Sequence, residues 1–319
     1  MLTMTTWLRR EFEEGPRWQR GLWVLAGVMF GVALVAAVGV FVDPRLIGGQ
    51  PAWLKPLKFG LSTGVYAVSV APALRRLVHR PRLQWGAAWT TVWVMAIEVG
   101  CIALQAARGT TSHFNFSTPF DSAVVTVMGV AIVTQTVVMG VVAVALWRTP
   151  VDDAQGWALR LGLTVAVAGA SLGGAMSAPT SRQLEAAAQG GAMPIIGSHT
   201  VGAPDGGPGL PLVGFSATHG DLRVAHFVGL HALQVLPLVA WVARRRSRSK
   251  ERQVRLVKAS AASLGAACLL LLLQALAQQS IVQPSTSALL GWATWLSGSA
   301  AAVAWAWHRE QSEKGAVLS

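Results

Sequence analysis

Charged side chains are scarce in this sequence. Asp, Glu, Lys and Arg together make up 13% of its 319 residues, whereas apolar residues make up 53%. A soluble domain carries roughly 25% of charged residues, so the composition excludes an ordinary soluble globular protein. It indicates instead an all-α fold, a polytopic integral membrane helix bundle.

Several familiar sequence signals are also missing. The two cysteines, Cys101 and Cys268, fall inside predicted membrane spans, which excludes a disulfide framework. The first apolar stretch has no A-x-A-type cleavage site, so we predict a retained helix rather than a secretory leader. No convincing internal repeat supports the inverted-repeat plan of many secondary transporters. The metalloprotease spacing H-E-x-x-H is absent, and no motif names a reaction.

What the sequence does contain is a series of long apolar stretches. A spanning helix needs about 20 mostly apolar residues, and about eight stretches meet this requirement. They are residues 22–42, 57–77, 86–107, 122–147, 158–180, 222–243, 256–278 and 285–307. The predicted organisation is therefore an N-terminal tail over 1–21, a transmembrane domain over 22–308 and a C-terminal tail over 309–319.

The distribution of basic residues predicts the orientation. Of the 26 Lys and Arg, 20 fall in the two tails and in the loops on the same side as the tails, and 6 fall on the other side. By the positive-inside rule both termini are cytoplasmic. The tryptophans agree, because many stand near the predicted cytoplasmic ends of helices, as in an interfacial belt. These are Trp23, Trp85, Trp89, Trp147, Trp241, Trp305 and Trp307.

The net charge of +12 also bears on partners. Basic residues are most concentrated in the loop 244–258. We interpret this loop as a topological anchor that also contacts anionic lipid headgroups. Because the basic residues sit in the loops of a membrane protein, the charge does not indicate nucleic-acid binding. We predict a multi-pass protein of the plasma membrane, such as a bacterial inner membrane, and leave its oligomeric state open.

One connection is long, the segment 181–221 on the outer side. It contains apolar residues and two histidines, and it lacks Lys and Arg after Arg182 until Arg223. A disordered linker is usually more charged and less apolar, so we expect an ordered flap over the outer mouth of the bundle. The alternative is a flexible extracytoplasmic loop.

Polar side chains gather toward the outer ends of the second and third spans. Glu98 stands within the third span, and Arg108 lies beyond its outer end. Charge is costly in hydrocarbon, so an ionisable residue at this depth indicates a site or a pathway. Glu98 is a candidate metal ligand, proton carrier or hydrogen-bonded partner. Lys55 and Lys58, one helical turn apart, are candidates for holding a phosphate or carboxylate, and the alternative is that both lysines reach out to lipid headgroups. With His113 they are the candidate cofactor-binding residues.

The sixth span combines Asp221, His226 and His231. The two histidines lie about 140 degrees apart on a regular helix, so they cannot easily bind one metal ion. We expect His226 near the outer mouth beside Asp221, and His231 as a deeper partner of Glu98, since both lie about 14 Å below the outer end of their helices. His199, from the long loop, joins Glu98 and these histidines as a candidate metal ligand.

Three functions remain open. The first is a metal- or haem-dependent membrane enzyme or redox protein with an outward-facing His, Glu and Asp site, in which Glu98, Arg108, Asp221, His226 and His231 act in catalysis. The cofactor is unknown, and a divalent metal ion or haem fits these residue types. The second is a proton-coupled transporter of a small solute. The third is a non-catalytic membrane subunit that binds lipid or a partner protein.

Overall fold

The computed structural model describes residues 15–317, and the ends of the predicted tails, 1–14 and 318–319, lie outside that range. The chain forms two compact units. The first consists of Met1–Leu146 with Pro179–Gly197, and the second of Trp147–Ala178 with Ser198–Ser319.

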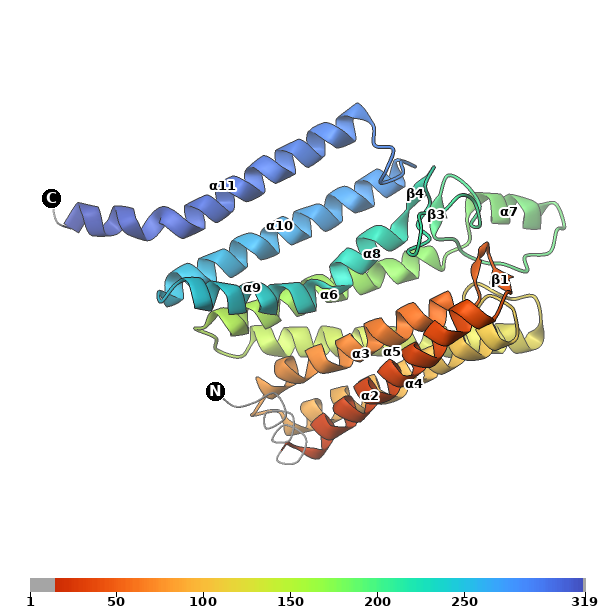
Figure 1. Ribbon diagram of the computed structural model, residues 1–319, viewed down its shortest axis with the longest axis horizontal. Helices are drawn as coiled ribbons and strands as arrows, with labels where there is room; N and C mark the ends of the chain where they lie inside the picture. The colour runs from red at the N-terminus through yellow and green to blue at the C-terminus, as the bar shows by residue number, and fades with distance from the viewer. Residues whose placement is uncertain (1–14, 318–319) are drawn as a thin grey trace. The chain divides into compact units, whose positions relative to one another are not determined.

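The first unit is a helix bundle built from the first four predicted spans. Its helices are α2 (Arg17–Val42), α3 (Leu54–Arg75), α4 (Pro81–Ala107), α5 (Pro119–Trp147, whose last residue belongs to the second unit) and the short α7 (Ser181–Ala188), and a small hairpin joins β1 (Leu46–Ile47) to β2 (Gln50–Pro51). α2 lies side by side with α3, and both pack on α4 (Figure 1). A buried cluster that includes Met29, Ala67, Met95 and Ala131 joins all four long helices.

The second unit is also helical. It contains α6 (Ala154–Met176), α8 (Leu222–Leu230), α9 (Ala232–Arg246), α10 (Lys250–Leu276) and α11 (Thr286–Val317), and β3 (Thr200–Val201) pairs antiparallel with β4 (Gly220–Asp221). α6 packs on α8, α9 and α10, while α11 lies beside α10 (Figure 1). The predicted sixth span is bent by 45° between α8 and α9. The bend lies between Gly229 and Pro237, and both residue types weaken a helix.

The fold confirms a mostly helical chain with several helices suited to a membrane. In the described range, six helices are long and apolar enough to cross, or seven if the bent pair α8–α9 is one span. The expectation of about eight is therefore not reached. The predicted eighth span, 285–307, is helical as part of α11, but α11 is not among the helices apolar enough to cross. The cytoplasmic position of both termini stays a prediction.

The long segment 181–221 has its own hydrogen-bonded structure. α7 begins with a capping box between Thr180 and Gln183. Further on, Ile195 bridges Asn115 within the first unit, and Thr200 pairs with Asp221 within the second. The segment thus contributes to both units, and its position over an outer mouth stays a prediction.

Two glycines set a close helix crossing in the second unit. A Cβ atom on Gly169 of α6 would lie 2.8 Å from the Cα atom of Gly229 of α8. We expect Gly169→Ala to lower the free energy of unfolding by about 1–3 kcal/mol, because the two backbones must move apart. The matched control is Gly174→Ala on the same helix, where a Cβ meets nothing within 4 Å. Thermal unfolding of the purified protein in detergent measures both changes, and equal melting temperatures would disprove the importance of this crossing.

Candidate functional site

One face of α4 carries polar side chains at a strict seven-residue interval. Gln84, Thr91, Glu98 and Gln105 form this α4 polar seam. Seven residues turn a helix to within about 20 degrees of two full turns, so the four side chains share one face. From the first to the last the helix rises about 31 Å, which matches the roughly 30 Å hydrocarbon core of a bilayer. The seam therefore presents hydrogen-bonding groups at regular intervals over a length that matches the thickness of a bilayer.

Three members of the seam are deeply buried inside the first unit. Thr91 and Gln105 are 0% exposed and Glu98 is 6% exposed. Burying polar groups is costly unless they form hydrogen bonds, so their partners show how the seam is built.

At the middle of the bundle the seam meets α3 and α5. The amide Nε2 of Gln135 donates to the Thr91 hydroxyl and to the Tyr66 hydroxyl, both at 2.9 Å. Tyr66 is the only tyrosine in the chain. The amide oxygen of Gln135 is buried without a hydrogen-bond partner among the described residues.

At one end of the seam, an ion pair joins α4 to α5. Asp121 accepts hydrogen bonds from Gln105 Nε2 at 2.8 Å, from Arg108 Nη1 at 2.5 Å and from the Thr118 hydroxyl at 2.6 Å. The Thr118 hydroxyl in turn accepts from the Asp121 backbone N–H, so this pair begins α5. Asp121 and Arg108 thus tie two helices together.

Glu98 lies between these two groups of partners. Its Oε1 atom is buried and has no hydrogen-bond partner in the described part of the chain. The Lys55 ammonium is close enough to interact electrostatically with the carboxyl group.

The beginning of α3 brings Lys55 to His113. The Lys55 Nζ atom lies 3.1 Å from His113 Nδ1, and the Ser112 hydroxyl lies at the same distance from that nitrogen. The His113 loop is held by pairing with the segment after α7, where Ile196 N–H donates to Phe114 O at 2.9 Å. Lys58 is half-buried one helical turn beyond Lys55. The structure thus brings together Glu98, Lys55 and His113 of the predicted residues.

The remaining candidate residues belong to the second unit and have local partners. Asp221 caps α8, accepts the backbone N–H of Ser216 and pairs with Arg223 at 2.6 Å. His226 Nδ1 lies 2.8 Å from Gly169 O, and His231 Nδ1 lies 2.7 Å from Phe227 O. His231 is exposed, whereas His226 is half-buried. Each histidine thus donates to a helix carbonyl, as a structural residue does.

His199 is also part of a local arrangement. Its Nδ1 atom lies 2.7 Å from Asp205, which accepts further hydrogen bonds from the backbone of His199 and Thr200. Burial raises the pKa of Asp205, but these hydrogen bonds and the His199 charge outweigh it and hold the pKa well below its usual range. The pair orders a turn of the loop.

These positions do not assemble a metal site. Within residues 15–317 no three His, Cys, Asp or Glu side chains come together as metal ligands. The predicted set of Glu98, His199, His226 and His231 is divided between the two units, and the pairing of Glu98 with His231 stays a prediction. The predicted metal-ligand set therefore has no geometric support among the described residues.

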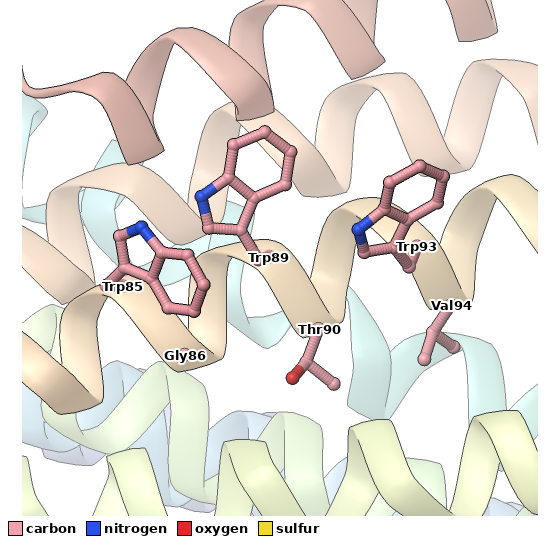
Figure 2. Close-up of a pocket in the computed structure, with 6 residues that line it drawn as sticks. All are labelled: Trp85, Gly86, Trp89, Thr90, Trp93 and Val94. Carbon is pink, nitrogen blue, oxygen red and sulfur yellow. The ribbon is translucent and has the colours of Figure 1, made fainter.

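The side of α4 opposite the seam carries a groove whose residues suit contact with a bilayer. It is lined by Trp85, Gly86, Trp89, Thr90, Trp93 and Val94. Figure 2 shows Trp89 and Trp93 projecting from one side of α4 and Thr90 and Val94 from the other. Trp85 and Trp93 are 59% and 64% exposed. Exposed tryptophans on an apolar helix suit a membrane interface.

Sequence reasoning missed Thr91 of the seam and its partners on α3 and α5. Tyr66, Thr91 and Gln135 were assigned no role, although each is a polar residue in an apolar stretch. The available signal was the interval of seven residues from Gln84 through Thr91 to Glu98 and Gln105. Comparison with protein-family models, curated proteins and solved structures finds no match for the chain.

Proposed function

We propose that this membrane protein is a proton-coupled carrier of a small solute, and that Glu98 is the group that binds the proton. The observation that carries the proposal is the buried Oε1 atom of Glu98, which lacks a hydrogen-bond donor among the described residues. A protonated carboxyl supplies its own O–H donor, whereas a carboxylate needs donors from its surroundings. A buried carboxyl in this state is suited to take up and release a proton.

The α4 polar seam supports the same function. Intramembrane carboxyl groups that serve proton relays lie among other polar groups rather than facing lipid. Thr91 and Gln135 lie about two helical turns from Glu98 on one side, and Gln105 lies two turns away on the other. The buried Gln135 oxygen also needs a donor, which a water molecule can supply. Protein groups and water then offer a route for protons to and from Glu98.

The test is solute-driven proton movement in proteoliposomes. Vesicles that contain the purified protein and a pH-sensitive dye are exposed to carboxylates, amines, sugars and divalent cations. We expect one class to change the internal pH without an imposed gradient, and protein-free vesicles to show no change. Infrared difference spectra after a pH jump provide a solute-independent measurement. The proposal is wrong if no class moves protons and the spectra show no carboxyl band that depends on Glu98.

A further inference from the structure

The groove on α4 lies between two rows of side chains, and we call it the tryptophan groove. Residues four apart follow one another along a helix surface, so two neighbouring rows leave a furrow between them. The rows are Trp85, Trp89 and Trp93 on one side, and Gly86, Thr90 and Val94 on the other. A Cβ atom on Gly86 would meet nothing within 4 Å, so the furrow is open at that residue.

The aromatic row is held in place by its neighbours. A Cβ atom on Gly21 of α2 would lie 3.5 Å from the Trp89 ring, so this ring packs closely on α2. The Trp85 ring lies beside it, with 6.3 Å between the ring centres. Figure 2 shows the indole nitrogens of Trp89 and Trp93 on the ring edges nearer to Trp85. The row thus directs indole N–H donors toward the end where α4 begins.

Exposed basic residues lie at that same end. Arg82 stands in the first turn of α4, three residues before Trp85, and is exposed. Side chains on a helix tilt toward its N-terminus, so Arg82 extends past the end of the groove. The packing of Trp89 on α2 brings the start of α2 alongside, which adds the exposed Arg17 and Arg20.

The acidic residues of the first unit lie elsewhere. Within its described residues they are Asp43, Glu98, Asp121 and Glu185. Asp43 follows the end of α2 and Asp121 stands in the first turn of α5, so neither lies where α2 and α4 begin. Glu98 is about 24 Å along α4 from Arg82, and Glu185 belongs to α7. The positive charge beside the groove is therefore complementary to an anionic headgroup.

The groove has about the length of one membrane leaflet. From Arg82 to Trp93 the helix rises about 17 Å, and half of a roughly 30 Å hydrocarbon core is about 15 Å. The groove has a volume of about 620 Å³, which lies in the range of small-molecule sites. A lipid with its headgroup at Arg82 can thus lay an acyl chain along the tryptophans toward the bilayer centre.

We propose that the tryptophan groove binds one anionic phospholipid, with the phosphate at Arg82 and an acyl chain beside Gly86 between the two rows. Arg82 supplies charge-assisted hydrogen bonds to the phosphate, and the indole N–H groups donate to the ester carbonyls. This end of α4 is the one predicted to be cytoplasmic, where anionic lipids attract basic residues. The inference goes beyond the proposed transport function and does not depend on it.

The test is native mass spectrometry of the full-length protein in detergent. The probes are phosphatidylglycerol and phosphatidylcholine with the same acyl chains. We expect one phosphatidylglycerol molecule to bind about tenfold more tightly than phosphatidylcholine, because several basic residues lie at the headgroup. Arg82→Gln should weaken phosphatidylglycerol binding by about fivefold and leave phosphatidylcholine binding unchanged, since one of these charges is lost.

Gly86→Leu tests the acyl-chain position without changing any charge. The added side chain should fill the furrow and weaken phosphatidylglycerol binding by at least about tenfold. It meets no neighbour at its Cβ atom and replaces a glycine within a helix, so the melting temperature should stay the same or rise. This variant also decides the question if Arg82→Gln does not insert correctly.

Matched variants control for general effects of size and charge. Gly100 lies on nearly the same face of α4, about 21 Å farther along the helix, and a Cβ atom there also meets nothing within 4 Å. Arg182→Gln removes an exposed positive charge from α7 in the same unit. Gly100→Leu and Arg182→Gln should both bind phosphatidylglycerol as the native protein does.

Equal affinity for the two lipids would overturn the proposal, and so would native binding by both Arg82→Gln and Gly86→Leu. Glycerol phosphate, which has the phosphate but no acyl chain, is a further probe. If it displaces phosphatidylglycerol as effectively as the lipid itself does, the site binds a free anion and the groove is not a lipid site. None of these results depends on proton movement, so the proposed function is tested separately.

Discussion

Asp121→Ala is expected to lower the free energy of unfolding by about 3 kcal/mol. Removing one partner of a buried ion pair costs roughly 3–5 kcal/mol, and the partial exposure of Arg108 places this pair at the lower end, because solvent screens its charge. The Asp121 side chain itself is 4% exposed. Its loss leaves the fully buried Gln105 amide without one acceptor and removes a contact that starts α5.

Denaturation in detergent, followed by circular dichroism, measures this change. Asp152→Ala is the matched control, because Asp152 is exposed in a loop and should alter stability by less than about 0.5 kcal/mol. Asp121→Asn keeps one acceptor oxygen and should fall between the two. Equal stability of Asp121→Ala and the native protein would show that the ion pair does not hold α4 to α5.

Glu98→Gln is expected to reduce solute-driven proton movement to the level of protein-free vesicles. Glutamine has nearly the same shape but cannot exchange a proton at neutral pH. It also removes the need to bury an ionisable group, so thermal stability should stay the same or rise. The combination of lost function and retained stability is what a proton-binding role requires.

Two variants sharpen the measurement. Glu185→Gln removes an exposed carboxyl from α7 in the same unit and should leave proton movement unchanged. Glu98→Asp keeps the carboxyl but shortens its reach, and should retain part of the movement. Full proton movement by Glu98→Gln, with a lower melting temperature, would assign Glu98 a purely structural role.

The sequence was sufficient for the class of protein and for many of the helices. Long apolar stretches must form helices in a membrane, because every backbone N–H and C=O has to be satisfied within the segment. The cost of placing a charge in hydrocarbon made Glu98 conspicuous as an ionisable residue in such a stretch. Thr118 and Asp121, at the start of α5, also have the side chains that helix starts favour.

The number of membrane-spanning helices was harder to predict from the sequence. α11 reads as apolar residue by residue, but its Ser, Thr and Gly residues keep it out of the group of helices apolar enough to cross. The bend between α8 and α9 was also not predicted, although Pro237 within α9 is a residue type that weakens a helix. Composition shows where a helix is weak, whereas packing decides where it bends.

By itself, the sequence determined the helical membrane character, the burial cost at Glu98 and the regular spacing that puts Glu98 and Gln105 on one face. Only the tertiary structure decided which partners meet that face. Gln135 and Asp121 reach it from α5, and Lys55 acts on it from α3, because the bundle brings together residues that are distant in the chain. The same folding gave His226 and His231 backbone carbonyl partners in the second unit. A one-dimensional pattern specifies a residue's face on its own helix, but its partners depend on how the helices pack.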